Sequence, residues 1–471
     1  MSATATTEKK YLKWYQKLAY GSGDLASNCS YGLVSSFVLL YLTGTLGLDS
    51  AIIGSLMLAS KVLDGISDVI FGTLIDRTHS KLGKARPWML FGQVGVSLCL
   101  FLLFAIPAGS TTMQYIYFFI VYTALNAVFY TANGIAYSSL VALITKNNNE
   151  RVQLGSFRFM FAVVTNIFMG FAVTGMVEKF GSGAAGWRTT ALIFAIVGLV
   201  VNTISCLAVK ELPEEELSGN TSEAAEEGKA VAEEKKHGFA ETAKILVHNK
   251  YYLMILAIYI VYYIMSNLTT GAGVFCATYY WGDGSLLGQF SMMKMFPVII
   301  ALAIAPVLIK KTGSMQKVNF WGYAISSVLG IPMIYFAMQK NLSMFLLFMF
   351  IKGIFAGTLS GSLNALIAEA SGYTTRTTGV HMDGMMYSCS SLGVKVGGGI
   401  GTAAVGWLLK LGGFVGTATV QSESAIRMIF NLYITFPFIL GIVITVLLAF
   451  LDVEKANKKW DADHAQKEAQ A

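Results

Sequence analysis

The stretch from Asp64 to Trp88 reads DGISDVIFGTLIDRTHSKLGKARPW, and it joins two long apolar runs through a short basic connection. Each of the two runs is long enough to cross about 30 Å of hydrocarbon as a helix. Runs of this kind recur along the whole chain. We expect them near residues 20–44, 50–75, 87–107, 113–143, 155–177, 188–209, 251–280, 287–310, 317–339, 343–368, 378–411 and 424–451. The sequence therefore predicts an all-α membrane protein with twelve transmembrane helices.

The composition supports a membrane protein independently of the runs. Hydrophobic residues make up 55% of the 471 positions and charged residues only 13%, and the mean hydropathy is +0.59. A soluble domain carries about 25% charged residues, because water must wet its surface. The net charge of +7 is spread over short segments between apolar runs, so we expect no nucleic-acid partner.

A polar segment divides the apolar runs into two groups of six. Residues 211–249 are rich in Glu, Ala, Lys and Ser, a composition that cannot bury a core. Two bundles that rock about a site near the membrane midplane are a recurring plan among transporters. We therefore expect an N-terminal tail at 1–19, a first bundle at 20–210, a linker at 211–249, a second bundle at 250–451 and a C-terminal tail at 452–471.

The basic residues predict how the chain crosses the membrane. Lysine and arginine fill the second, fourth, eighth and tenth connections, whereas the first, third and seventh contain none. Positively charged loops stay on the cytoplasmic side. We therefore expect a multi-pass protein of the plasma membrane, surrounded by lipid and monomeric, with both termini and the linker in the cytoplasm.

The second apolar run carries three charged residues, Lys61, Asp64 and Asp68. Their i, i+3, i+7 spacing puts all three on one helical face. Charge at this depth is costly unless it faces a cavity or a partner. Two carboxylates one turn apart, with Ser67 beside them, form an oxygen site suited to Na⁺, Li⁺ or a proton. A Lys–Asp ion pair that fixes helix packing is the alternative.

Further polar residues lie inside the other apolar runs. Tyr137 follows Asn133 by one helical turn, and an amide beside an aromatic ring is a combination that binds sugars. Asn and Tyr also make ordinary contacts between helices, so this pattern alone leaves both readings open. The remaining members are Asn28, Arg158, Lys294, Lys352, Asn364 and Lys395.

Lys395 lies within a stripe of small residues, Gly393, Gly397 and Gly401. Such a stripe lets another helix approach closely. Lys395 is two positions from Gly393 and from Gly397, so we expect it to point away from the stripe and into a cavity. The glycine run follows no predicted strand and is no dinucleotide loop, and the chain has no HExxH, Walker or GxSxG motif. We therefore expect no enzyme.

The stretch from Asp64 to Trp88 resembles the signature of the glycoside–pentoside–hexuronide:cation symporters, a branch of the major facilitator superfamily. The wider superfamily's loop motif between helices two and three fits Gly72, Asp76, Arg77, Gly83, Lys84 and Arg86. Further matches are Tyr20-Gly21-x-Gly23-Asp24, Glu150-Arg151 and Lys395. The resemblance spans nearly the whole chain and is sharper in its first half.

The resemblance implies a set of site residues. Its cation site falls on Asp64, Ser67 and Asp68, with Asp64 and Asp68 as metal ligands if the cation is Na⁺, and a further oxygen falls on or near Tyr130, with Thr131 adjacent. Its sugar-binding positions fall on Asn28, Asn133, Tyr137 and Arg158, and its helix-eleven lysine on Lys395. A charge network of gating residues is implied at Lys61, Asp76, Arg77, Lys84 and Arg86.

Departures from the family pattern bear on the cargo. Melibiose permeases carry aspartates where this chain has Asn28 and Asn133, and an aromatic common to several members becomes Asn364. The loss of two negative charges beside Arg158, Lys61 and Lys395 favours a hexuronide or glucuronide-like glycoside over a neutral galactoside. The alternative is that the asparagines bond the hydroxyls of a neutral sugar equally well.

The expected function is symport of a cation and a sugar or glycoside by alternating access. The coupling ion is Na⁺ or H⁺, and no other cofactor is expected. A sugar uniporter or a cation antiporter on the same scaffold is the alternative. A channel is disfavoured, because the charges gather in one cluster instead of following a continuous pore.

Overall fold

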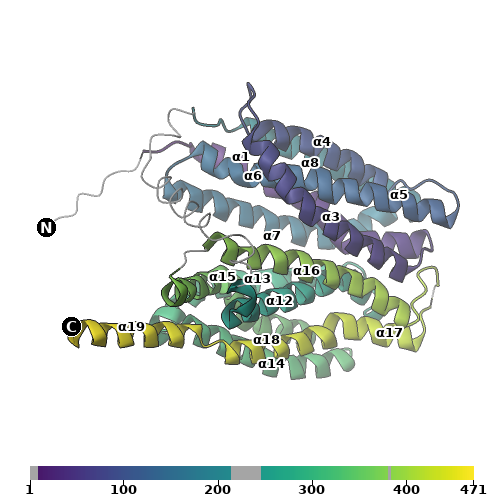
Figure 1. Ribbon diagram of the computed structural model, residues 1–471. Helices are drawn as coiled ribbons and strands as arrows, with labels where there is room; N and C mark the ends of the chain where they lie inside the picture. Colours follow the sequence, from purple (N-terminus) through teal and green to yellow (C-terminus); the bar gives the residue numbers. More distant parts are fainter. Residues whose placement is uncertain (1–8, 214–244, 380–382, 419, 471) are drawn as a thin grey trace. The chain divides into compact units, whose positions relative to one another are not determined.

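The computed structural model describes residues 9–213, 245–379, 383–418 and 420–470, and within them it contains helices and no strand (Figure 1). The first half of the chain forms α1 (Trp14–Gly21), α2 (Gly23–Leu40), η1 (Tyr41–Thr45), α3 (Ser50–Asp76), α4 (Arg86–Leu103), α5 (Thr111–Thr123), η2 (Ala124–Tyr130), α6 (Thr131–Ile144), α7 (Asn148–Lys179) and α8 (Gly183–Leu207). The second half forms α12 (Lys250–Phe275), η3 (Cys276–Tyr280), α13 (Leu286–Thr312), α14 (Met315–Met338), α15 (Leu342–Thr378), α16 (Asp383–Leu411), α17 (Glu423–Phe430), η4 (Asn431–Thr435), α18 (Phe436–Phe450) and α19 (Val453–Gln470). The segments labelled η are π-helical turns within longer helices.

The helices confirm the predicted fold class. Eleven helical spans of the described chain are long and apolar enough to cross a membrane. The twelfth predicted span is α3, which has 27 residues and contains Lys61, Asp64, Asp68 and Asp76. Side chains such as Phe91, Leu98 and Val328 are more than half exposed, which suits a surface that lipid covers.

Local sequence explains where α3 begins. The carboxylate of Asp49 accepts hydrogen bonds from the backbone amides of Ala51 (2.9 Å) and Ile52 (3.3 Å), the usual geometry of an acidic N-cap. The helix ends where Arg77 forms the C-cap. Because α3 is one uninterrupted helix, the spacing of its charged residues fixes their common face.

The start of α4 depends on a carboxylate from a distant part of the chain. The backbone amides of Lys84, Ala85 and Arg86 donate to the Glu211 carboxylate at 2.7, 3.0 and 3.1 Å. Gly83 has φ of 112°, and a Cβ there would lie 2.3 Å from Glu211 Cδ. The glycine of the loop motif is therefore needed both for its backbone angle and for the close approach of Glu211.

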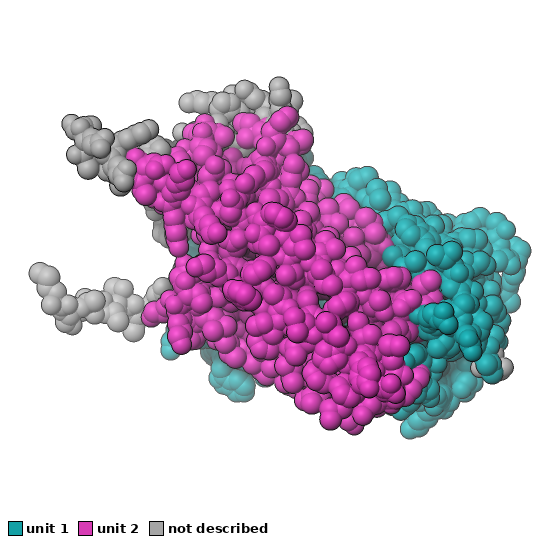
Figure 2. All heavy atoms as spheres, turned by 90° about the horizontal axis from the view of Figure 1, so that it is seen from below, with its two compact units in different colours: residues 1–219, 273–291, 403–427 teal, residues 220–272, 292–402, 428–471 magenta. Residues whose placement is uncertain are grey.

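The described chain packs as two compact units, which Figure 2 distinguishes by colour. Unit 1 holds residues 1–219, 273–291 and 403–427, and unit 2 holds 220–272, 292–402 and 428–471. Two segments of the second half thus belong to unit 1. One of them packs closely on α3: Ser50 Oγ donates to the Gly406 carbonyl at 2.9 Å, and a Cβ at Gly54 would lie 2.7 Å from the Ala403 carbonyl oxygen.

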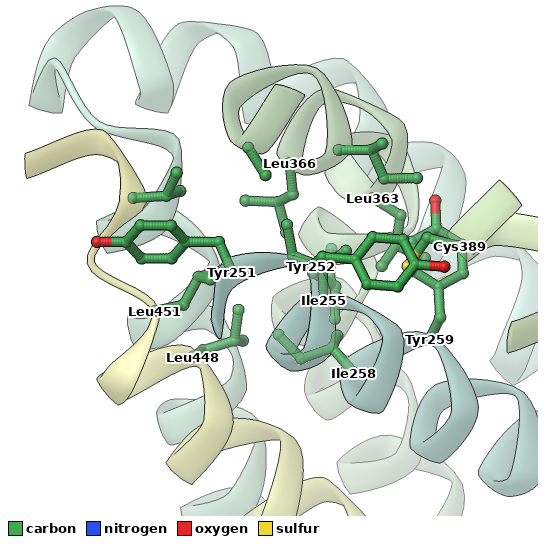
Figure 3. Packing of buried hydrophobic residues seen from close by; sticks show 14 of the residues in the cluster. Tyr251, Tyr252, Ile255, Ile258, Tyr259, Leu363, Leu366, Cys389, Leu448 and Leu451 are labelled. Carbon is green, nitrogen blue, oxygen red and sulfur yellow. The ribbon is translucent and has the colours of Figure 1, made fainter. Parts of the chain in front are cut away.

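Unit 2 has an apolar core of its own. Figure 3 shows aromatic residues of α12 packed against leucines of α15 and α18. Ile258 and Leu366 are fully buried there. The labelled members are Tyr251, Tyr252, Ile255, Ile258, Tyr259, Leu363, Leu366, Cys389, Leu448 and Leu451.

The glycine stripe of α16 packs on α12, as its spacing predicts. If each glycine carried a Cβ, the one at Gly393 would lie 2.3 Å from Tyr259 Cβ. Those at Gly397 and Gly401 would lie 2.5 Å and 2.6 Å from the carbonyl oxygens of Ile260 and Ile264, respectively. Lys395 is half-buried and lies off this contact line. The stripe brings the two backbones together and thereby fixes the rotation of α16.

Candidate cation and substrate site

The carboxylate of Asp64 is the centre of a polar cluster in unit 1. Lys61 Nζ lies 3.6 Å from Asp64 Oδ2, and these side chains are 19% and 14% exposed. From the facing helix α6, Thr131 Oγ1 lies 2.7 Å from Asp64 Oδ1. Ser67 Oγ donates to the backbone carbonyl of Asp64 at 2.9 Å. The cluster thus contains an ion pair and also a set of oxygen atoms that could bind a cation, so it is compatible with both interpretations of the sequence.

The hydroxyl of Thr131 has two hydrogen-bond acceptors and one proton. Besides Asp64 Oδ1, it lies 2.9 Å from the carbonyl oxygen of Asn126 in the π-helical segment η2. The carbonyl can only accept, so Thr131 either shares its proton between the two oxygens or receives one from a protonated Asp64. A π-helical turn commonly marks a functional position, because it re-aims the residues that follow it.

Aromatic rings cover one side of this cluster. Tyr130 stacks on Tyr31 of α2 with ring centroids 5.6 Å apart, and Lys61 Nζ lies 6.0 Å from the centroid of Tyr31. Of the two neighbouring candidates for a cation ligand, Thr131 is the residue whose hydroxyl reaches Asp64. Tyr130 contributes its ring to the aromatic cover on one side of the Asp64 cluster.

A second charged cluster in unit 1 contains Arg158. Arg158 Nε and Asp24 Oδ2 are 2.6 Å apart, with side-chain exposures of 25% and 17%. The guanidinium lies 4.1 Å from the ring centroid of Tyr137, and the Tyr137 hydroxyl donates to the Tyr20 carbonyl at 2.8 Å. The positive charge of Arg158 is therefore already paired within the protein.

The two asparagines at the predicted sugar positions have different surroundings. Asn28 is partly exposed; its Nδ2 donates to the Asp24 carbonyl at 2.7 Å and its Oδ1 accepts from Asn166 at 2.9 Å. Asn133 is buried, and its Nδ2 donates to the Met89 carbonyl at 2.7 Å. In this structure Asn133 and Tyr137 bond neighbouring helices, whereas Asn28 and Arg158 keep part of their surface open.

Apart from Lys61, which lies within α3 beside Asp64, the predicted gating residues lie at the end of α3 and around the start of α4. Asp76 and Arg77 are exposed at the end of α3. Arg86 is buried, and its Nε donates to the Cys206 carbonyl of α8 at 3.2 Å. Arg86 and the Lys84 amide therefore help to hold the start of α4 against the end of α8.

The two predicted substrate residues of the second half lie in unit 2. Asn364 Oδ1 accepts from the Tyr259 hydroxyl at 2.8 Å. Lys395 is half-buried on α16. Sequence reasoning gave no role to Asp24, Tyr31 or Asn166. Asp24 was visible as an acid within the opening motif of the first helix, but its pairing with Arg158 joins positions that are 134 residues apart.

Apolar helices long enough to cross a membrane, with a partly buried carboxylate that faces a hydroxyl of another helix, are typical of a polytopic secondary transporter. The chain belongs to the MFS/sugar transport protein family, whose model matches residues 19–455. It is 26% identical to the isoprimeverose transporter of Lactiplantibacillus pentosus over 98% of this chain and 93% of that protein. It is 24% identical to the inner membrane symporter YicJ of Escherichia coli K12, over 90% and 88%.

Solved structures agree with the family assignment at the level of the fold. A bacterial homologue of the human lysosomal transporter Spinster superposes with a TM-score of 0.66 at 13% identity, covering 95% of this chain and 98% of that one. The major facilitator fold predicted from the sequence is thereby confirmed.

Proposed function

We propose that this protein is a sugar or glycoside symporter of the plasma membrane, driven by Na⁺ or H⁺, with both termini in the cytoplasm. The family assignment supports a sugar as cargo, and the names of the two relatives speak for a sugar and for symport. The observation that carries the coupling is the Asp64 cluster. A carboxylate inside a membrane helix, within 2.7 Å of a hydroxyl on a facing helix, is placed to hold a cation.

The single hydroxyl proton of Thr131, which has two acceptors, suggests how a bound cation would stabilise this site. When Asp64 is protonated, it donates to Thr131, and Thr131 donates to Asn126 without sharing its proton. A sodium ion at Asp64 would meet the same need, because it takes a lone pair of the hydroxyl and neutralises the carboxylate. Binding of either cation removes the competition for one proton and stabilises the contact between α3 and α6.

We assign the cation to Asp64, Ser67, Asp68 and Thr131, with Tyr130 in the aromatic cover. Within unit 1 we assign the sugar to Asn28 and Arg158, with Tyr137 supporting Arg158 and Asn133 holding α6 against α4, and within unit 2 we assign it to Asn364 and Lys395. Uptake of labelled glycosides into proteoliposomes, with and without an imposed Na⁺ or H⁺ gradient, tests the proposal. Symport requires accumulation against the sugar gradient, whereas a uniporter equilibrates the sugar and an antiporter expels it.

Asparagine variants then test the assignment of the cation. Asp64→Asn and Asp68→Asn are each expected to abolish gradient-driven accumulation while part of the sugar binding survives, because cation and sugar occupy separate, linked sites. Wild-type accumulation by Asp68→Asn would remove that residue from the site. Accumulation without any cation gradient would refute symport itself.

A further inference from the structure

Exposed lysines gather at one corner of unit 2, where the connection between α13 and α14 meets α19. The Gln316 amide donates to Glu454 Oε1 at 3.0 Å, and Lys458 Nζ donates to the Gly313 carbonyl at 3.1 Å, so the first turns of α19 lie against this connection. Each lysine of the group is one of these contact residues or lies within three positions of one. We call the group the basic corner; its members are Lys310, Lys311, Lys317, Lys455, Lys458 and Lys459, all of them exposed.

The acids nearest to the basic corner along α19 are bound elsewhere. Asp452 and Asp461 pair with basic residues of α12 and α15 at 3.1 and 3.5 Å. The carboxylate of Glu454 accepts hydrogen bonds from the α13–α14 connection. Within the described part of the chain, none of the lysines of the basic corner forms an ion pair with a carboxylate. The corner therefore presents its positive charge to the surroundings.

Exposed apolar side chains lead up to the basic corner along both helices. On α13, Val307 is 65% exposed and Leu308 is also exposed, and Lys311 follows both by one helical turn. On α14, Lys317 comes one turn before Trp321, which is 61% exposed. Each apolar stripe thus ends in a lysine at the connection. Tryptophan beside a basic residue is typical of the boundary between hydrocarbon and headgroups.

This arrangement has the chemistry of an anionic phospholipid. Groups of four to eight lysines next to a transmembrane helix attract anionic lipids. A lysine at the end of an apolar stripe can lay its methylenes along the stripe and keep its ammonium at the level of the headgroups. A soluble anion would need the lysines alone, whereas a lipid also needs the apolar stripes for its acyl chains.

We propose that the basic corner is an interaction surface for the headgroup of an anionic phospholipid, whose acyl chains lie along the apolar stripes of α13 and α14. The phosphodiester neutralises lysines that belong to three helices, and it thereby strengthens the contact of α19 with the α13–α14 connection. The surface lies wholly within unit 2. It is separate from the Asp64 cluster and does not depend on which cargo the transporter carries.

Native mass spectrometry of the purified full chain in detergent tests the surface with defined lipids. Dioleoyl phosphatidylglycerol should bind the wild type more tightly than dioleoyl phosphatidylcholine, and it should raise the melting temperature more. Each lysine at an anionic surface strengthens the attraction about fivefold. The triple variant Lys310→Gln, Lys311→Gln, Lys317→Gln should therefore bind phosphatidylglycerol at least about tenfold more weakly and phosphatidylcholine as before. Arginine at the same three positions keeps the charge and should preserve the affinity.

A second triple variant controls for the loss of three charges. Lys10→Gln, Lys13→Gln and Lys81→Gln change exposed positions of unit 1 and should leave phosphatidylglycerol binding unchanged. If the corner variant does not fold, Lys455→Gln with Lys459→Gln gives the same test and spares the contact of Lys458 with Gly313.

Two outcomes would overturn the proposal directly: a wild type that binds both lipids equally well, or phosphatidylglycerol binding that the corner variants leave unchanged. A third concerns free phosphate. If inorganic phosphate at constant ionic strength abolishes the stabilisation by phosphatidylglycerol, the lysines bind a soluble anion and the surface is not a lipid site.

Discussion

Thr131 is the side chain whose replacement tests the cation site most finely. Thr131→Val keeps the shape and removes the hydroxyl that reaches Asp64 at 2.7 Å. Since a hydrogen bond to a charged group contributes about 1.5–3 kcal/mol, the cation concentration for half-maximal uptake should rise by about tenfold or more. Titration of uptake against Na⁺ and against pH measures it. Thr131→Ser, which restores the hydroxyl, should stay close to the wild type, and equal behaviour of Val and Ser would exclude a role for the oxygen.

Asp24 and Arg158 make a second prediction at the same scale. Removing one partner of a buried ion pair costs about 3–5 kcal/mol, and the partial exposure of these side chains puts the cost below that range. Asp24→Asn and Arg158→Gln should each lower the melting temperature in detergent more than the double variant does. If the two losses simply add, the pair does not stabilise the protein.

Single residues also show how far the sequence could go. The i, i+3, i+7 spacing placed Lys61, Asp64 and Asp68 on one face, because helical periodicity is a local property. Asp24 could not be paired with Arg158 in the same way, because that contact depends on how α2 and α7 pack. Asn133 looks the same in the sequence whether it meets a sugar or the Met89 carbonyl, and only packing distinguishes these environments.

Among the elements, the contact between α12 and α16 allows a stability prediction. Gly397→Ala would bring a Cβ within 2.5 Å of the Ile260 carbonyl oxygen, so the two helices must separate. We expect a lower melting temperature, although alanine favours a helix by about 1 kcal/mol over glycine. Gly175→Ala in α7 meets nothing within 4 Å and serves as the control, which should be neutral or stabilising. A melting temperature that rises equally in both variants would mean that the close contact of α16 with α12 is not needed.

The ion pair between α3 and α16 gives a second element-scale prediction. Lys410 Nζ lies 2.6 Å from Asp49 Oδ2, and this lysine first, with the amides of Ile52 and Ala51, lowers the pKa of Asp49 below its usual value. Because the pKa of Asp49 is lowered in the folded state, its ionisation stabilises the folded protein at pH values above the ordinary pKa of about 4. This stabilisation is lost as the pH falls through the lower pKa that Asp49 has in the folded protein. The contact should therefore persist from about pH 5 up to the alkaline range in which Lys410 loses its proton.

Asp49→Asn tests this contact selectively, because asparagine still caps α3 but cannot pair with Lys410. A cysteine introduced at the exposed Ser55, which accepts from Trp407 at 2.9 Å, should react faster with a membrane-impermeant maleimide in this variant. The native cysteines of the described chain are buried, so the background is low. An unchanged labelling rate would show that the ion pair does not hold the segment closed.

Elements were predictable where they depend on composition, and less so where they depend on hydrogen-bond register. The apolar runs predicted the membrane spans, because every span must cross the same thickness of hydrocarbon. The π-helical turns carried no such signal. They nevertheless reveal a likeness between the halves: Leu46 and Leu48 donate to the carbonyls of Tyr41 and Leu42, and Trp281 and Asp283 donate to those of Cys276 and Ala277 in the same pattern.

For the molecule as a whole, the basic connections predict which ends of the helices face the cytoplasm. Single cysteines at Gln339 and at Lys81, both exposed in connections between helices, test this in a background without the native cysteines. An impermeant maleimide should label Gln339→Cys in intact cells and Lys81→Cys only after the membrane is opened. Labelling of Lys81→Cys in intact cells would invert the topology.

Counting the apolar runs predicts a division into two halves, but it does not predict which distant segments pack together. Segments 273–291 and 403–427 pack with the first half, because residues such as Gly406 and Ala403 closely approach Ser50 and Gly54. These contacts join positions about 350 residues apart and leave no mark in local composition.

The carboxylate of Glu211 has a consequence for how the chain is made. It receives the amides that start α4, and Leu212 donates to the Leu143 carbonyl at the end of α6, so the residues that follow α8 fasten three helix ends at once. All of these groups are synthesised before α12. Since domains fold as units from the N-terminus during synthesis, the first six helices can close in the membrane while the second six are still being translated.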